Sequence, residues 1–180
     1  MSRPAALAAG LLLLAGCPSD EPVAGMLTLP DQVVEGFTMH ESSSGERLYT
    51  LRADTAYVFD AEGRVDVVEP RVDFYDETGA VHAVLVARRG EIFSSSSNLV
   101  ARGEVVVETA DSTLLQTDSL GWNNTTREVR TDAPVDIATP KGRVSGQGLV
   151  SDAGLTRIRI LSEVSGQAEY RFEAGPDSGE

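Results

Sequence analysis

The sequence contains very few of the residues from which most catalytic and metal centres are built. Its 180 residues include one cysteine and two histidines, which excludes an intramolecular disulfide and a multi-cysteine zinc site. Neither His40 nor His82 has a companion at metal-ligand spacing, so we interpret both as ordinary strand or surface histidines. No phosphate-binding loop, nucleophile elbow or paired His/Cys motif occurs. We therefore expect no catalytic residue, no metal and no cofactor.

Positive charge is also scarce. The chain has 15 Lys and Arg against 28 Asp and Glu, which gives a formal net charge of −13. Nucleic-acid binding and adsorption to anionic lipid headgroups both need a basic surface, so this balance argues against both. Hydrophobic residues make up 41% of the chain, too many for a protein that is disordered as a whole. An acidic globular domain remains.

The apolar run near the N-terminus is too short to span a bilayer. Ala5–Ala15 has eleven residues, about 16 Å as a helix, whereas the hydrocarbon core is ~30 Å thick. Arg3 precedes the run, and Leu14-Ala15-Gly16-Cys17 at its end resembles a bacterial lipobox. The layout predicts a lipoprotein signal peptide over residues 1–16 and acyl chains on Cys17 that anchor the mature protein. A plain signal peptide with a chance cysteine is the alternative.

The rest of the chain has the period of a β-structure. From Phe37 onward apolar residues recur at every second position, which predicts half-buried strands. The clearest series is Tyr49, Leu51, Ala53, Thr55, Tyr57 and Phe59. Turn sequences such as Ser44-Gly45 and Lys141-Gly142 separate these segments, and no capped amphipathic helix occurs. We predict an all-β domain of two opposed antiparallel sheets over residues 31–172, with a flexible tether at 17–30 and a disordered tail at 173–180.

Several short stretches spread along residues 30–170 carry a family resemblance. In order they are Phe37–Met39, Gly45–Asp54, Glu69–Asp76, Ala87–Gly90, Gly103–Val107, Leu115–Leu120, Thr131–Val135 and Gly146–Leu149. Their order and spacing resemble the LptC family, the periplasmic component of the bacterial lipopolysaccharide-export machinery. The resemblance implies a folded-over, elongated β-jellyroll whose two sheets form a V-shaped trough for the acyl chains of lipid A. It also implies three partners: lipopolysaccharide, an LptBFG-type inner-membrane ABC transporter and an LptA-type bridge protein. Neighbouring proteins of this machinery would pair edge to edge through their strands.

The N-terminus departs from that family. Its members are typically held by one transmembrane helix, and here the lipobox takes the place of that helix, so a role of the helix in regulating the transporter's ATPase is not carried over. We expect a periplasmic lipoprotein in the inner membrane rather than the outer one. Pro18 after Cys17 supplies no clear retention signal.

Alternation and resemblance together predict two sets of site residues. The expected trough lining is Phe37, Met39, Tyr49, Leu51, Phe74, Leu85, Val105, Leu115, Trp122 and Ile137. The expected partner-binding edge strands carry Val33, Phe37, Ile158, Ile160, Val164 and Gly166. The same alternation would also produce a dry core, so a structural envelope lipoprotein that scaffolds other proteins is the alternative function. A sugar-binding jelly roll is a weaker one, since aromatic residues are only 6% of the chain. The acidic charge further predicts that lipopolysaccharide is recognised mainly through apolar contacts.

Overall fold

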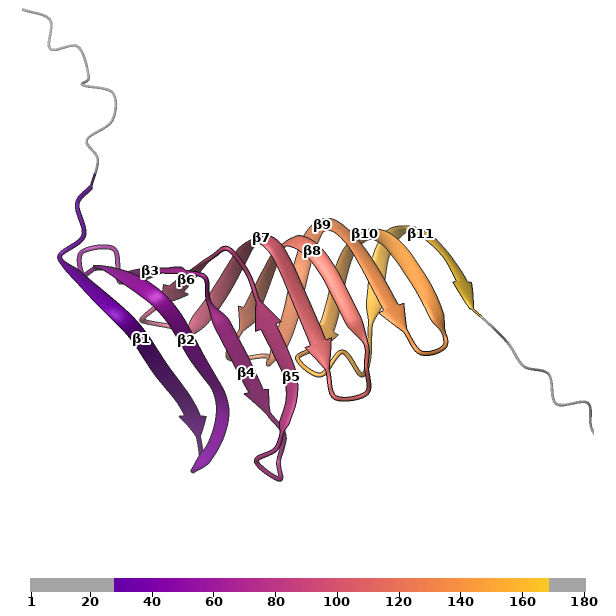
Figure 1. Cartoon of the computed structure of the whole chain (residues 1–180), viewed down its shortest axis with the longest axis horizontal. Coiled ribbons are helices and arrows are strands. Elements are labelled where there is room, and N and C mark those ends of the chain that lie inside the picture. Colours follow the sequence, from indigo (N-terminus) through magenta and orange to yellow (C-terminus); the bar gives the residue numbers. More distant parts are fainter. Residues whose placement is uncertain (1–27, 169–180) are drawn as a thin grey trace, which may run out of the picture.

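The computed structural model describes residues 28–168, which form strands and their connections without a helix. The signal peptide, Cys17, most of the tether and the tail lie outside these described residues. In chain order the strands are β1 (Gln32–Ser43), β2 (Glu46–Phe59), β3 (Arg64–Val68), β4 (Arg71–Tyr75), β5 (Val81–Val86), β6 (Arg89–Phe93), β7 (Asn98–Thr109), β8 (Leu114–Asn123), β9 (Glu128–Thr139), β10 (Gly142–Asp152) and β11 (Arg159–Ala168). All pairings are antiparallel. The strands stack along the long axis from β1 at one end to β11 at the other (Figure 1), so the predicted all-β fold is confirmed.

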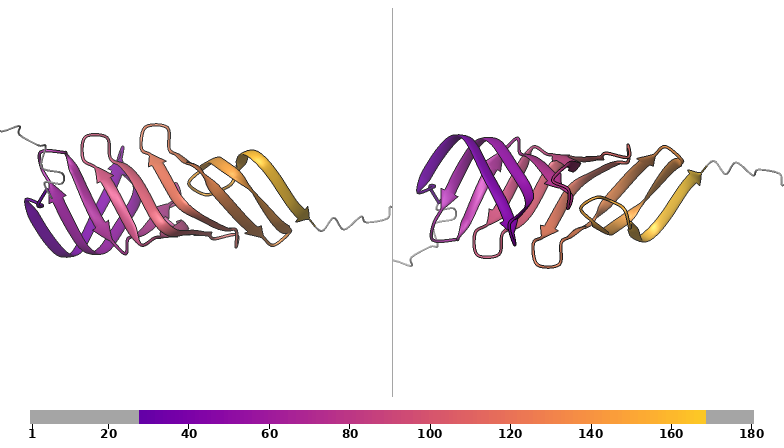
Figure 2. Two further views of the ribbon diagram at one scale, coloured as in Figure 1. Left: turned by 90° about the horizontal axis from the view of Figure 1, so that it is seen from above. Right: turned by 90° about the horizontal axis from the view of Figure 1, so that it is seen from below.

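The sheet folds over on itself because its long strands pass from one layer into the other (Figure 2). Strand β2 pairs with β4 through Tyr49–Arg52 and with β3 through Thr55–Phe59. Strand β7 likewise pairs with β6 through Asn98–Arg102 and with β5 through Val106–Thr109. We call the layer that contains β4 and β5 half-sheet 1, and the layer that contains β3 and β6 half-sheet 2. The long strands contribute one end to each half-sheet.

An irregular line of backbone, which we call the crease, joins the two half-sheets. It passes through residues 36, 54, 69–70, 87–88, 103–104, 118–119, 132–134, 147–148 and 162–163. Positive φ angles gather on it, at Gly36 (64°), Glu69 (49°), Gly103 (75°), Glu104 (48°), Gly148 (73°) and Glu163 (52°). Strands β7, β8 and β10 also shift register there. Bulges of this kind bend a strand, so the crease turns one extended sheet into two facing layers.

The crease also corrects the alternation expected for β2. Tyr49, Leu51 and Ala53 are buried as predicted, but beyond the crease Ala56 is completely buried and Tyr57 is 36% exposed. The strand bends between Ala53 and Ala56, which moves the inward-facing positions by one residue. The prediction of an unbroken inward series through Thr55 and Tyr57 is therefore wrong.

Directly paired residues form an apolar ladder across the inner face of half-sheet 1. From β1 to β11 its members are Met39, Leu51, Val72, Leu85, Val107, Leu115, Ile137, Val144 and Gly166. A facing ladder in half-sheet 2 runs through Val58, Val65, Ile92, Leu99, Trp122, Val129 and Ser151. Cross-strand pairs of large apolar side chains stabilise a sheet, and the ladder members from Met39 to Ile137 and from Val65 to Val129 belong to one elongated core or pack against it.

Candidate functional site

The ten residues predicted to line a trough all lie on this inner surface. Eight of them are buried in one continuous core: Tyr49, Leu51, Phe74, Leu85, Val105, Leu115, Trp122 and Ile137. Phe37 and Met39, on the terminal strand β1, are partly buried and pack against the same core. The structure therefore brings the ten together, and their role in binding a ligand stays a prediction.

Other core residues were missed by the sequence-based selection. Val72, Leu99 and Val135 belong to segments with visible alternation and could have been included on that ground. Leu155 carries no such signal, because it lies in the loop between β10 and β11 with a φ of 51° and still buries its side chain in the core. A loop residue of this kind is recognised only once the chain is folded.

The interior is nearly filled by side chains. A small void of about 20 Å³ remains between the half-sheets, lined only by apolar side chains together with Pro70. Phe74 and Trp122 lie beside it with ring centroids 5.4 Å apart, and Tyr49 completes the cluster at 6.0 Å from Phe74 and 6.5 Å from Trp122. These rings come from β2, β4 and β8, and they join the two half-sheets in the middle of the core.

Opposite the crease lies the rim, where the hairpin turns of the two half-sheets face each other and are joined by hydrogen bonds. The Tyr49 hydroxyl donates to the carbonyl of Ser97 at 3.4 Å, and Asn124 Nδ2 donates to Glu41 Oε1 at 3.2 Å. Burial raises the pKa of the Tyr49 phenol, and the nearby Glu41 carboxylate raises it further. The phenol therefore stays protonated and keeps its role as a donor across the rim.

A pocket of about 670 Å³ opens at this rim, and we call it the mouth pocket. One side is formed by residues 46–48, 75–78 and His82 of half-sheet 1, and the other by Trp122, Arg127 and residues 152–154, 156 and 157 of half-sheet 2. Phe74 and Trp122 line both the mouth pocket and the small void below it. The two rings therefore separate solvent from the core at this place.

A larger groove, of about 1010 Å³, follows the crease. It is mainly acidic, with Glu69, Glu104, Asp118, Asp136 and Glu163 among its lining residues. Arg88 is also in the groove and forms an ion pair with Glu104 at 2.8 Å. Of the predicted lining residues, the groove includes Val105 alone, so it is distinct from the interior.

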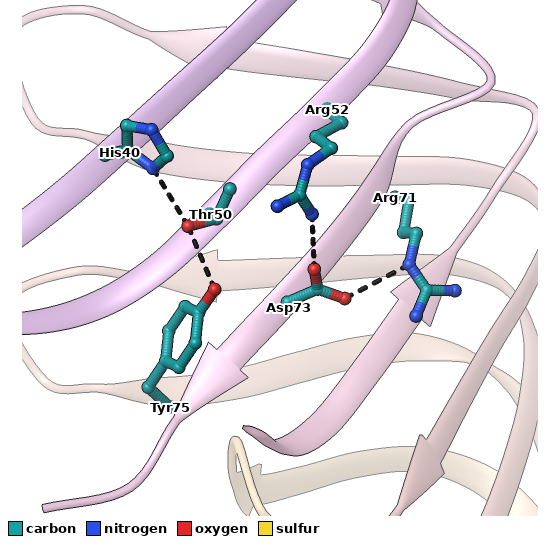
Figure 3. Close-up of polar contacts among 6 residues, drawn as sticks. All are labelled: His40, Thr50, Arg52, Arg71, Asp73 and Tyr75. Atoms are coloured by element: carbon teal, nitrogen blue, oxygen red, sulfur yellow. Dashed lines mark hydrogen bonds and ion pairs between the residues drawn. The ribbon is translucent and has the colours of Figure 1, made fainter. Parts of the chain in front are cut away.

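The outer face of half-sheet 1 carries a polar cluster near β1 (Figure 3). His40 Nδ1 lies 2.9 Å from Thr50 Oγ1, and the Tyr75 hydroxyl donates to the same oxygen at 3.2 Å. Thr50 is completely buried between them. These bonds link β1, β2 and β4 on the side away from the core.

Beside this cluster, two arginines share one carboxylate. Arg52 and Arg71 are direct cross-strand partners on β2 and β4, an arrangement that is repulsive by itself. Asp73 lies between them, 2.5 Å from Arg52 Nη1 and 3.1 Å from Arg71 Nε. We assign this group a structural role, because the carboxylate is buried and offsets the repulsion.

The predicted edge residues lie on the two terminal strands. Val33 and Phe37 are on β1, Ile160, Val164 and Gly166 are on β11, and Ile158 directly precedes β11. Val33 is 57% exposed and Val164 is 62% exposed. Strand β1 pairs only with β2 and β11 only with β10 among the described residues, so each leaves one backbone edge unpaired. A Cβ at Gly166 would lie 2.7 Å from the carbonyl oxygen of Arg143, which shows that this glycine is needed for the β10–β11 pairing itself.

Within residues 28–168 no three His, Cys, Asp or Glu side chains are grouped so as to hold a metal ion. The same residues contain no helix that is long and apolar enough to cross a membrane.

Comparison with known proteins shows which fold and which family the chain shares. LptH, "the LptA homologous periplasmic component of the conserved lipopolysaccharide transport device from Pseudomonas aeruginosa", has a similar fold with a TM-score of 0.53 and 10% sequence identity. The match covers 68% of this chain and 95% of LptH, so the fold is an LptA-like β-jellyroll. A family model described as "Lipopolysaccharide-assembly, LptC-related" matches residues 5–169. The chain belongs to this LptC-related family of lipopolysaccharide assembly, and the resemblance drawn from the short stretches is confirmed. No curated protein matches the sequence.

Proposed function

We propose that the protein carries lipopolysaccharide through the periplasm. It would receive lipopolysaccharide from an LptBFG-type inner-membrane ABC transporter and pass it to an LptA-type bridge protein. The observation that supports this most strongly is the apolar ladder of half-sheet 1, whose apolar side chains run from Met39 on the terminal strand β1 to Val144 on β10. Membership of a transport family agrees with a carrier rather than a catalyst.

The energetics of lipid A explain why an apolar interior is needed. An acyl chain of about twelve methylenes loses roughly 10 kcal/mol of favourable burial in water, at about 0.8 kcal/mol per CH₂. Several chains on one molecule make unassisted passage through the periplasm prohibitive. The ten predicted lining residues offer a surface on which these chains stay out of water.

Cargo of this size requires the two half-sheets to separate. The interior void of about 20 Å³ is close to the size of one water molecule, whereas even benzene needs a cavity of ~150 Å³. The irregular crease is suited to act as the hinge, and the rim carries hydrogen bonds that can break, such as Tyr49 to Ser97. We infer that acyl chains replace contacts between the facing ladders when the rim opens.

The two unpaired edges supply the protein contacts in this proposal. Backbone donors and acceptors along β1 and β11 can pair with a neighbour's strand, which extends the sheet from one protein to the next. Val33 and Phe37 would lie at one junction, and Ile158, Ile160, Val164 and Gly166 at the other. Aligned sheets would then give a continuous apolar path. Acyl chains on Cys17 would tether the assembly to the inner membrane.

One observation favours the alternative of a scaffold lipoprotein with a solid β-sandwich, namely the nearly filled interior. Photocrosslinking decides between the two functions. A photoreactive side chain at Leu51, which lines the void, should label lipopolysaccharide, and the same group at exposed Asp54 should not. Labelling from Asp54 without labelling from Leu51 would rule out the carrier and leave the scaffold.

A further inference from the structure

The mouth pocket has the composition of a site for an amphiphilic ligand. Its floor contains the rings of Phe74 and Trp122, which lie directly above the apolar void. Its walls are polar and charged, and they come from both half-sheets. A ligand held here would therefore contact solvent on one side and the core on the other.

Two residues that line this pocket each have a buried nitrogen atom without a hydrogen-bond partner in the described part of the chain. These atoms are Trp122 Nε1 and His82 Nδ1. Trp122 is only 7% exposed, and a buried donor without a partner is costly and uncommon in native proteins. An acceptor oxygen of a ligand would satisfy the indole N–H.

Three arginines stand around the same opening. Arg47 and Arg127 form no ion pair with any described residue, and Arg157 is 3.9 Å from Asp152. Arg47 also packs over the ring of Tyr75, with its guanidinium carbon 5.8 Å from the ring centroid. Guanidinium groups that are not neutralised by a carboxylate are well suited to bind an anionic oxygen pair.

Four carboxylates also line the mouth pocket, and two of them accept hydrogen bonds within the turns in which they lie. Asp76 accepts hydrogen bonds from Thr78 and Ala80, and these bonds lower its pKa. Asp152 accepts from the backbone N–H of Thr156 at 2.7 Å. Glu46 and Glu77 remain. Arg47 and Arg127 form no ion pair with these two carboxylates either, so both guanidinium groups remain available as donors beside them.

We propose that the mouth pocket binds a phosphate group that is carried next to the acyl chains of an amphiphile. Arg47 and Arg127 bind the phosphate oxygens, the Trp122 indole donates to an oxygen at the base of the pocket, and the adjoining acyl chain passes between Phe74 and Trp122 into the core. This inference rests on the proposed function and adds a polar subsite to it. It also revises the expectation that recognition is mainly apolar.

The test uses the full chain and three probes: diphosphorylated lipid A, lipid A from which both phosphates have been removed, and inorganic phosphate alone. Trp122 is the only tryptophan in the chain, so its fluorescence and its single indole N–H resonance report directly on the pocket. The double variant Arg47→Gln/Arg127→Gln is compared with Arg130→Gln/Arg143→Gln. The control pair loses the same charge and lies outside the mouth pocket.

We expect diphosphorylated lipid A to shift the indole resonance, and its affinity to fall at least about tenfold in Arg47→Gln/Arg127→Gln, since charge-assisted hydrogen bonds are lost. The control variant should bind like the unaltered chain, and dephosphorylated lipid A should bind about as weakly to all three proteins. If both double variants bind diphosphorylated lipid A equally, the phosphate subsite is overturned while the carrier function stands. If lipid A binds to none of the proteins, both proposals fail. If inorganic phosphate alone shifts the indole resonance by the same amount, the ligand is not an amphiphile and the pocket is a site for the free anion.

Discussion

Leu114 and Leu115 are adjacent residues of one type on opposite faces of β8, and they provide a direct test of the inner face. Leu115 is completely buried between Val107 and Ile137 in the apolar ladder, whereas Leu114 is partly exposed on the outer face. Truncating a buried leucine costs about 2–5 kcal/mol, and the cost increases when the surroundings cannot collapse into the cavity. Both neighbours of Leu115 are fixed in paired strands, so we expect Leu115→Ala to cost about 3–4 kcal/mol.

The measurement is urea denaturation of the two single variants, followed by circular dichroism. Leu114→Ala should lose less, about 1 kcal/mol, because part of its side chain already contacts water and its removal leaves no enclosed cavity. For a domain of this size, the loss at Leu115 corresponds to a decrease in Tm of roughly 10 °C. Equal losses in the two variants, or a larger loss for Leu114→Ala, would refute the assignment of the inner face.

Three further predictions concern an edge, an ion cluster and a turn. Val164→Asp changes an exposed side chain, so it should leave the free energy of unfolding nearly unchanged and reduce recovery of an LptA-type bridge protein in a pull-down. Gly166→Val should instead lower the free energy of unfolding, because its Cβ would meet the backbone of β10. Asp73→Asn should cost about 1 kcal/mol in denaturation experiments, since Arg52 and Arg71 then face each other unneutralised, and the loss should shrink in high salt. Asp76 has a pKa below its ordinary 3.8, so its contribution is present above that pH and disappears as the pH falls through the lowered value. In thermal unfolding, Asp76→Ala should therefore have a lower Tm than the unaltered chain at pH 7, and this difference should shrink as the pH falls below 3.8.

The predicted strands and inner residues follow from simple patterning. A period of two identifies the positions that face the core, and Gly-containing pairs such as Ser44-Gly45 mark hairpin turns where positive φ is required. That is why all ten predicted lining residues lie on or against one core. The signal is local, and each strand carries it independently of its partners.

The crease could not be predicted in the same way. Its positive-φ residues include Glu69, Glu104 and Glu163, which have no special preference for that backbone conformation and give no warning in the sequence. The bend at each strand depends on the bends of its neighbours, and it shifts the inward positions in β2. The mouth pocket was missed for a related reason, since Arg47 is brought to the Trp122–Arg127 hairpin from a distant part of the chain only when the half-sheets face each other.

Separation of the two half-sheets around hydrocarbon is the central claim, and a distance across the rim tests it most directly. Spin labels at Ser44 and Ser95, on exposed turns of opposite half-sheets, can be measured by pulsed electron paramagnetic resonance in a chain with Cys17→Ala. A second pair at Ser95 and Thr125, both on turns of half-sheet 2, serves as the control. With lipopolysaccharide the Ser44–Ser95 distance should lengthen while the Ser95–Thr125 distance stays the same. Identical Ser44–Ser95 distances with and without saturating lipopolysaccharide would contradict the account.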